Sequence, residues 1–235
     1  MQYLLFSIEG NIGSGKSTFI KYLKKIDFTK NLSQDDYKVI YLSEPVNEWV
    51  DIKDESGETI LAKFYKDQNR YSFAFQMMAY ISRINQLMET IETLKKENEE
   101  KGTNKKYIII TERSVYTDKN VFAKMLKDDG KIESVEYQIY LKWFDNFTKN
   151  IYFHGNIYLY ANTAVCFERI KKRNRPGETM SFEYLNNCNL YHNKWLLGDE
   201  YNDKILKINA NEDYDENLPR EWLVNTIDYI NSYIN

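Results

Sequence analysis

The sequence predicts an α/β fold in which a five-stranded parallel sheet carries helices on both of its faces. Short apolar runs of strand length alternate along the chain with longer segments of helical periodicity, which is the pattern of βαβ units. Several of these runs are apolar throughout, as expected for strands buried on both faces. The sequence shows no repeat, low-complexity linker or domain boundary, so we expect a single domain over residues 1–235.

The expected elements follow one another with short connections. Strands are expected at residues 3–8, 37–43, 107–111, 156–160 and 204–208. Helices are expected at residues 17–26, 59–66, 69–99, 116–127, 134–153, 163–172, 181–196 and 218–234. Strand 37–43 ends at Glu44-Pro45, because proline cannot donate to the hydrogen-bond ladder of a sheet. Strand 107–111 is short and fully apolar, which favours a central place in the sheet.

The most specific motif is Gly-Asn-Ile-Gly-Ser-Gly-Lys-Ser at residues 10–17, which fits the phosphate-binding pattern G-x-x-x-x-G-K-[ST]. It lies between a predicted strand and a predicted helix, where backbone N–H groups and the helix N-terminus can face an anion. Lys16 would reach the β- and γ-phosphates, and the Ser17 hydroxyl would hold Mg²⁺. The rest of the predicted phosphate cradle is Gly10, Asn11, Gly13, Ser14, Gly15 and Thr18. The sequence therefore predicts a P-loop NTPase-type sheet that binds a nucleoside triphosphate.

Composition excludes several other classes of protein. A net charge of −3 argues against general binding to nucleic acid, which usually needs a basic face. The two cysteines and two histidines stand apart in the sequence, which argues against a disulfide framework and a structural zinc site. No apolar run reaches the length of a membrane span, and a first strand at Tyr3 leaves no room for a signal peptide. We therefore expect a soluble cytosolic enzyme without nucleic-acid or membrane partners.

Charged side chains follow two of the predicted strands directly. Glu44 comes after strand 37–43, and Glu112-Arg113 comes after strand 107–111. Ligands of open α/β sheets bind at the carboxyl ends of the strands, where the phosphate-binding loop also lies. A carboxylate that faces a triphosphate is unfavourable unless it holds Mg²⁺ or accepts a proton, so two of them suggest a base and a ligand of the metal shell. Either glutamate alone could equally be a helix-capping or surface acid.

Five segments in series resemble the cellular deoxynucleoside kinases, the family of the deoxycytidine, deoxyguanosine and mitochondrial thymidine kinases and of the insect multisubstrate enzyme. The resemblance covers nearly the whole chain, and its segments are Gly10–Ser17, Glu44-Pro-Val-Asn-Glu-Trp49, Phe75-Gln76, Glu112-Arg-Ser-Val-Tyr116 and Arg169-Ile-Lys-Lys-Arg-Asn-Arg175. It implies ATP-dependent 5′-phosphorylation of deoxynucleosides in nucleotide salvage. It also implies a homodimer, which in this family commonly forms through a pair of helices.

The resemblance assigns roles around the triphosphate. Glu44 looks like the general base for the nucleoside 5′-hydroxyl, Arg113 would contact that hydroxyl or the phosphates, and Glu112 would orient Mg²⁺ through its hydration shell. Positioned cations stabilise the charge that spreads over the transferred group, which is the expected role of Lys16 and Arg173. The arginines that resemble the lid, at about residues 169–180, are Arg169, Arg173 and Arg175. The alternative for them is a solvated basic helix end.

The nucleoside contacts are implied in the same way. Gln76 matches a glutamine that makes a bidentate contact with the base, because an amide offers both a donor and an acceptor. The remaining expected contacts are Ile12 and Trp49 for the walls, Phe75 and Phe122 beside the base, Tyr65 and Glu178 for the sugar 3′-hydroxyl, and Asp213 and Tyr214 for the adenine of the donor. Core packing remains an alternative role for Trp49, Phe75 and Phe122. The segment Arg175-Pro-Gly-Glu178 departs from the pattern of the family, because it has one acid where relatives usually have two.

Arg83 and Asp118 match a pair found in the deoxycytidine and deoxyguanosine kinases. An acid can accept from the amino group of cytosine or adenine, and an arginine can donate to ring nitrogens or to a guanine oxygen. Thymidine-accepting relatives carry small or apolar residues at these positions, which leave room for the 5-methyl group. The pair therefore predicts a preference for deoxycytidine or purine deoxynucleosides over thymidine. The alternative is an Arg–Asp ion pair on the surface.

Three other functions compete with this interpretation. A nucleoside monophosphate kinase of the thymidylate-kinase type shares the loop, the sheet and the lid, but it needs cations to hold the phosphate of its acceptor. A GTPase is disfavoured because the sequence contains no N-K-x-D guanine motif. A regulatory module without catalysis is disfavoured by the intact set of Lys16, Ser17, Glu44 and Arg113.

Overall fold

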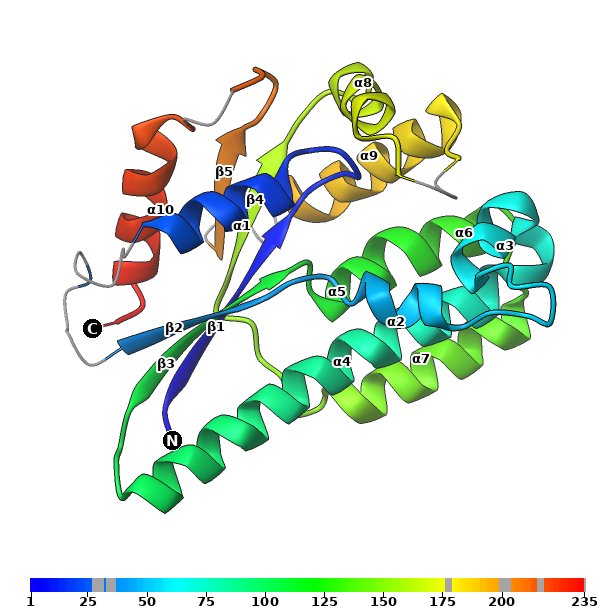
Figure 1. Cartoon of the computed structure of the whole chain (residues 1–235). Helices are drawn as coiled ribbons and strands as arrows, with labels where there is room; N and C mark the ends of the chain where they lie inside the picture. Colours follow the sequence, from blue (N-terminus) through cyan, green and yellow to red (C-terminus); the bar gives the residue numbers. More distant parts are fainter. Residues whose placement is uncertain (27–31, 33–36, 176–178, 199–203, 215–217, 235) are drawn as a thin grey trace.

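A computed structural model of the chain describes residues 1–26, 32, 37–175, 179–198, 204–214 and 218–234. Within these ranges, five parallel strands form one sheet in the order β2-β3-β1-β4-β5 (Figure 1). The strands are β1 (Tyr3–Glu9), β2 (Tyr37–Leu42), β3 (Lys106–Glu112), β4 (Gly155–Tyr160) and β5 (Ile205–Asn209). The predicted parallel sheet is confirmed. The strand at its middle is β1, and β3 lies next to it inside the sheet.

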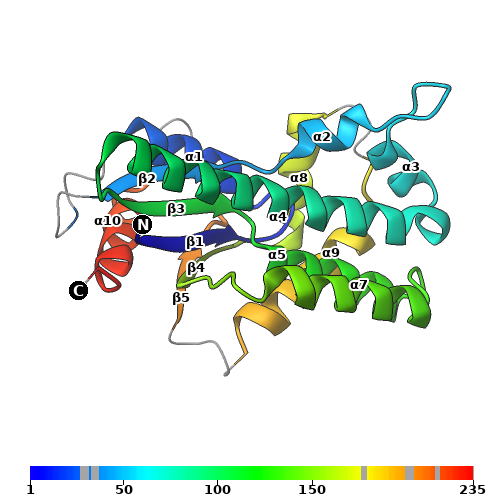
Figure 2. The same cartoon turned by 90° about the horizontal axis from the view of Figure 1, so that it is seen from below.

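Helices cover both faces of the sheet, as Figures 1 and 2 show from two directions. One face carries α1 (Lys16–Lys25) and α10 (Arg220–Asn231), and the other carries α4 (Gln68–Lys101) and α7 (Ser134–Thr148). The remaining helices are α2 (Val46–Asp51), α3 (Ile60–Lys66), α5 (Val115–Thr117), the π-helical η2 (Asp118–Ala123), α6 (Lys124–Asp128), α8 (Thr163–Arg173) and α9 (Phe182–Leu196). No helix in the described ranges is both long and apolar enough to cross a lipid bilayer.

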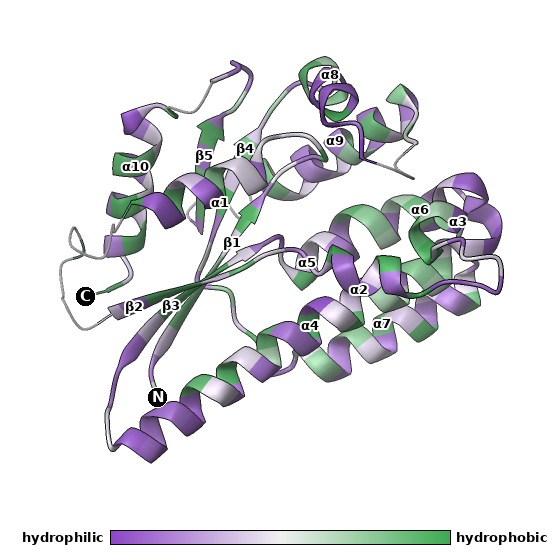
Figure 3. Ribbon diagram, in the orientation of Figure 1, coloured by the Kyte–Doolittle hydropathy of each residue, from purple (hydrophilic) through white to green (hydrophobic). Residues whose placement is uncertain are grey.

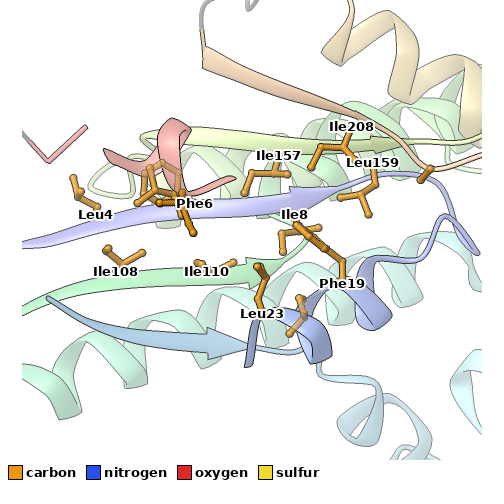
Figure 4. Close-up of a cluster of buried hydrophobic side chains, with 14 of the residues drawn as sticks. Leu4, Phe6, Ile8, Phe19, Leu23, Ile108, Ile110, Ile157, Leu159 and Ile208 are labelled. Carbon is orange, nitrogen blue, oxygen red and sulfur yellow. The ribbon is translucent and has the colours of Figure 1, made fainter. Parts of the chain in front are cut away.

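Alternation of side chains along the strands gives the sheet two cores. Leu4, Phe6 and Ile8 of β1 point to the face of α1, where they join the buried cluster of Figure 4. Leu5 points to the opposite face and packs in a cluster with Ile84 and other side chains of α4 and α7. Each fully buried side chain of this size stabilises the fold by about 1.5–3 kcal/mol. In Figure 3 the middle of the sheet is correspondingly green, and the free C-terminal end of α4 is purple.

The register of the strands brings the functional segments to one edge of the sheet. Ile8 of β1 pairs with Glu112 of β3, and the Arg113 N–H donates to the Ile8 carbonyl at 3.0 Å. Leu42, the last residue of β2, pairs with Thr111. The phosphate-binding loop, Glu112-Arg113 and Glu44 therefore all begin at neighbouring strand ends.

Three helical regions differ from the sequence-based expectation. Helix α2 was missed, because six residues are too short to show a helical period, and it buries Trp49. The predicted helix 116–127 is three pieces, since its middle, η2, is a π-helix, a form that the hydrophobic pattern does not distinguish. The predicted helix 134–153 ends at Thr148 because the chain must reach β1, where the backbone of His154 donates to the Leu5 carbonyl at 2.8 Å.

Gly155, at the start of β4, permits a close approach by Tyr229 of α10. A Cβ added at Gly155 would lie 2.2 Å from the Tyr229 hydroxyl oxygen. That hydroxyl donates to the Lys204 carbonyl at 2.6 Å and accepts from the Asn156 N–H at 3.1 Å, so it is held in place.

We therefore predict that Gly155→Ala lowers the free energy of unfolding by about 1–3 kcal/mol, the usual cost of overpacking. Urea denaturation followed by circular dichroism measures it. In a Tyr229→Phe background the penalty should shrink, because the nearest obstructing atom is gone. An unchanged unfolding midpoint in Gly155→Ala would contradict the packing described for this strand.

Candidate active site

The carboxyl ends of β1, β2 and β3 open into one cavity of about 520 Å³, within the usual range for small-molecule sites. It runs from the phosphate-binding loop to the aromatic side chains between α2, α3 and α4. The sequence-predicted residues that line it are Ile12, Gly13, Ser14, Gly15, Lys16, Ser17, Thr18, Glu44, Trp49, Tyr65, Phe75, Gln76, Arg83, Glu112, Arg113, Asp118, Phe122, Arg169, Arg173, Arg175, Asp213 and Tyr214. Glu178 lies outside the described residues, as does the adjoining part of the predicted lid.

The phosphate-binding loop is pressed against the sheet and α8. Gly10 and Gly13 have φ values of 147° and 81°, in the left-handed region that favours glycine. A Cβ at Gly10 would lie 2.4 Å from the Leu159 carbonyl oxygen, and one at Gly13 would lie 2.5 Å from that of Cys166. Asn11 secures the loop from behind, because its amide donates to the Leu185 carbonyl of α9 at 3.0 Å. The loop is therefore tightly packed against β4, α8 and α9.

Lys16 is the cation of this loop. Its ammonium group donates to the Gly10 carbonyl at 3.1 Å and to the Asn11 carbonyl at 2.8 Å. Burial, reinforced by the neighbouring Arg113 charge, lowers the pKa of Lys16 to about 7. An added negative charge beside Lys16 would favour its protonated form.

Ser17 and Glu112 meet at the N-terminus of α1. The Ser17 hydroxyl donates to Oε1 of Glu112 at 2.6 Å, and Glu112 is largely buried. A hydroxyl and a carboxylate oxygen beside a phosphate site suit Mg²⁺, which usually takes one or two protein oxygens and completes its shell with phosphate oxygens and water. The donor set present thus fits that cation.

Glu44 lies between two guanidinium groups. Its Oε1 is 3.1 Å from Nη2 of Arg83 and 3.3 Å from Nε of Arg113. Burial disfavours the carboxylate, but Arg113, Arg83 and Lys16 outweigh it and hold the pKa of Glu44 below its ordinary value. Glu44 is consequently ionised at neutral pH, the state in which a carboxylate can accept a proton.

Arg113, which lines the cavity, occupies a strained backbone conformation. Its φ is 64°, in the left-handed region, which costs a residue other than glycine about 1–3 kcal/mol. The surroundings hold it there: Nη1 donates to the Gly10 carbonyl at 2.8 Å, and the guanidinium lies 5.0 Å from the centre of the Phe122 ring. Such overdetermined strain is typical of functional sites.

Arg83 and Asp118 form a buried pair, so the surface ion-pair alternative is wrong. Nε of Arg83 is 2.9 Å from Oδ2 of Asp118, and the two residues are 5% and 1% exposed. Nη1 of Arg83 also donates to the Glu112 carbonyl at 3.1 Å. The pair lines the cavity beside the ring of Trp49, whose indole N–H donates to the Ser82 hydroxyl at 2.9 Å.

Aromatic rings and one amide form the inner end of the cavity. The Phe75 ring stacks on Phe64 at 4.6 Å and meets Trp49 edge-on at 5.6 Å, so these rings pack as a core and line the cavity at the same time. Gln76 is 2% exposed, and its Oε1 has no hydrogen-bond partner within the described part of the chain. A buried acceptor without a partner is costly, and this one faces a cavity where a ligand could satisfy it.

At the opposite end, Arg169 binds the loop that follows β5. Its guanidinium donates to Asp213 Oδ1 at 2.8 Å, to the Ala210 carbonyl at 2.8 Å and to the Glu212 carbonyl at 2.7 Å. The side chain expected over the phosphates therefore joins α8 to this loop. Arg173 and Arg175, also from the expected lid, line the cavity.

Sequence reasoning missed several residues behind the site. Glu9 is fully buried and accepts hydrogen bonds from the Ser114 N–H, at 2.9 Å, and from the Thr117 hydroxyl, which links β1 to both ends of α5. His192 of α9 is fully buried, with its Nε2 3.2 Å from Nη1 of Arg113. A signal existed for Glu9, an acid at the end of an apolar strand directly before the glycine-rich loop. None existed for His192, which is 79 residues from Arg113.

Comparison with known proteins agrees with this geometry. The family model described as deoxynucleoside kinase matches residues 6–231. The probable deoxycytidine kinase of Fowlpox virus (strain NVSL) is 35% identical over 95% of this chain and 87% of its own length. Deoxycytidine kinase 2 of Gallus gallus is 32% identical over 94% of this chain and 88% of its own, and the mitochondrial deoxyguanosine kinase of Xenopus laevis is 30% identical over 92% and 85%. This chain therefore belongs to the deoxynucleoside kinase family of phosphotransferases.

Proposed function

We propose that this kinase transfers the γ-phosphoryl group of ATP, with Mg²⁺, to the 5′-hydroxyl of deoxycytidine or a purine deoxynucleoside. The observation that carries the proposal is one continuous cavity in which an ionised Glu44 lies between the phosphate-binding loop and the side chains of Gln76, Arg83 and Asp118. A phosphoryl donor and a nucleoside acceptor that both bind in this cavity would meet at Glu44 and Arg113. Residues 1–235 would act as one catalytic unit.

Each side chain has a task that its position supports. Glu44 accepts the proton of the attacking hydroxyl, and Arg113 and Lys16 stabilise the charge on the transferred group. Arg173 of the lid adds a further cation to the cavity wall. Ser17, together with Glu112 through the hydration shell, would hold Mg²⁺, which would neutralise charge on the phosphate oxygens. Asp213 and Tyr214 receive the base of the donor, beside Arg169.

Replacing the base tests this assignment. Glu44→Gln should lower kcat by about 10²–10⁴-fold, the usual contribution of a positioned general base, because the amide cannot accept the proton. Steady-state kinetics with deoxycytidine and ATP–Mg²⁺ measures it. The control is Glu48→Gln, which alters an exposed acid on the neighbouring helix α2 and should leave kcat within twofold of the parent. Equal rates for Glu44→Gln and the parent would remove Glu44 from the mechanism.

The depressed pKa of Lys16 predicts that nucleotide binding takes up protons. In the free enzyme Lys16 loses its proton as pH rises through about 7, whereas the bound triphosphate favours the charged form. The affinity for ATP should therefore fall above that pH, by at most about tenfold per pH unit. Calorimetry at pH 8 in buffers of different ionisation enthalpy reports the proton uptake directly. Lys16→Met should abolish it, and no uptake by the parent would contradict the assignment.

The preference among bases rests on Arg83 and Asp118. Asp118 can accept from an exocyclic amino group, and Arg83 can donate to a ring nitrogen, whereas thymine brings a methyl group toward the same wall. Gln76, whose buried Oε1 needs a donor, completes the recognition of the base edge. Each such contact is worth about 1–3 kcal/mol of discrimination.

Replacing the pair together, as Arg83→Met with Asp118→Ala, removes both buried charges and leaves neither unpaired. The ratio of kcat/KM for thymidine to that for deoxycytidine should rise by roughly ten- to a hundredfold, in keeping with that discrimination. The ratio is the readout, because Arg83 also holds Glu44 and the absolute rates will fall. The control replaces the exposed pair Lys119–Asp145 with the same two residues and should not change the ratio. An unchanged ratio in the Arg83 and Asp118 variant would refute the assignment.

We further propose that two copies associate through α4 and α7. Helix α7 exposes an apolar stripe with a spacing of four residues, Val135, Ile139, Trp143 and Phe147, each at least 42% exposed. Ile81 and Met88 are exposed on the adjacent α4. A stripe of this kind can pack against its own copy across a two-fold axis, as in most homodimers.

The free, buried thiols of Cys166 and Cys188 suit a reducing compartment. We therefore propose that the protein is located in the cytosol, which cell fractionation would test.

Light scattering after gel filtration should give twice the mass of the chain for the parent and the monomer mass for Ile139→Lys with Trp143→Lys, because lysines in a buried apolar interface are unpaired charges. The matched control is Leu190→Lys, an equally exposed apolar residue on α9. A monomeric parent, or a dimer that survives both lysines, would exclude this interface.

A further inference from the structure

His192 does not line the cavity, but it contacts Arg113, which does. Its Nε2 is 3.2 Å from Nη1 of Arg113, and its Nδ1 is 2.7 Å from the Cys188 carbonyl oxygen one turn earlier on α9. A carbonyl oxygen can only accept, so the proton of the neutral ring is on Nδ1. Nε2 then carries a lone pair, and Arg113 donates to it.

The imidazole is fixed in this orientation by its neighbours. The Tyr158 ring of β4 lies parallel to it, with centres 6.4 Å apart, and Phe122 of η2 meets it edge-on at 6.2 Å. Burial, together with the charges of Arg113 and Lys16, holds the pKa of His192 well below its ordinary value. The ring therefore stays an uncharged acceptor.

The contacts of Arg113 show what this acceptor does. Nη1 has two N–H groups, which are directed to the Gly10 carbonyl and to His192 Nε2, and Nε faces Glu44. Within the described part of the chain, these contacts leave the two N–H groups of Nη2 for a ligand in the cavity that Arg113 lines. A second carboxylate in place of the imidazole, in addition to Glu44, would hold the guanidinium equally well but would offset more of the charge that a phosphoryl group needs.

We propose that His192 is a positioning residue for Arg113, a neutral acceptor that fixes the guanidinium while leaving its charge and its Nη2 donors to the reacting phosphoryl group. The inference rests on the proposed role of Arg113 in phosphoryl transfer. Because His192 acts on a group that stabilises the transition state, its loss should reduce kcat and change the KM for the nucleoside little.

Kinetics of two variants separate this role from simple packing. His192→Phe keeps an aromatic ring without the acceptor and should lower kcat on the order of ten- to a hundredfold, the effect of a small misplacement of a catalytic group. His192→Gln restores an acceptor near the position of Nε2 and should recover most of the lost kcat. If His192→Phe lowers kcat by about a hundredfold, kcat in His192→Gln should be at least about tenfold higher than in His192→Phe. The control for lost packing is Leu196→Ala, because Leu196 lies one turn along α9 and is equally buried. This variant should leave kcat per folded molecule unchanged. Equal kcat values in the Phe and Gln variants would overturn the proposal.

A measurement on the unaltered protein covers the case in which the variants fail to fold. The chain has two histidines, and the structure places them in opposite tautomers, because Nδ1 of His154 accepts from the Leu5 N–H at 3.0 Å. Nitrogen-15 NMR of the labelled side chains should show His192 as the Nδ1–H form, unchanged between pH 5 and 8. An Nε2–H tautomer or titration of His192 in that range would overturn the proposal. This readout needs no activity, so it can fail while the proposed function stands.

Discussion

The arrangement of Arg113 is the constraint on which the rest of the site depends. This residue holds a left-handed backbone conformation at the end of β3, and its side chain contacts the phosphate-binding loop, Glu44 from the end of β2 and His192 from α9. Each contact comes from a different segment of the chain. The parallel register of β1 and β3 fixes the backbone of Arg113, because its N–H continues the hydrogen-bond ladder to the Ile8 carbonyl. This backbone contact and the side-chain contacts together sustain the strain.

Charge balance explains how such a site can be buried before any ligand binds. Lys16, Arg83 and Arg113 are each buried, and they alternate with Glu44, Glu112 and Asp118. A buried charge without a partner costs several kcal/mol, so removing one member of this network disturbs the others. The same balance keeps Glu44 ionised, while burial and the Arg113 charge lower the pKa of Lys16, so that a triphosphate would complete the network rather than disrupt it.

Much of the fold and of the candidate site could be predicted from sequence, wherever the signal is local. The glycine-rich loop, the apolar strands and the charged residues directly after them are contiguous patterns, and strand order then brings them together at one edge. Arg83 and Asp118 were predicted to pair only through a resemblance, and the structure shows them in contact and buried. Helix α2 and the π-helix η2 were missed because one is too short to show a period and the other depends on a hydrogen-bond shift. His192 and Glu9 were missed because their partners are set by tertiary packing between distant segments.

The most direct measurement is phosphoryl transfer from ATP–Mg²⁺ to a panel of deoxynucleosides, ribonucleosides and deoxynucleoside monophosphates. If Glu44 and Arg113 serve a cavity built for an uncharged acceptor, deoxycytidine or the purine deoxynucleosides should be phosphorylated, with little turnover of thymidine. Turnover of the monophosphates alone would contradict the central claim, because it would mean that the cations around Glu44 bind the phosphate of the acceptor.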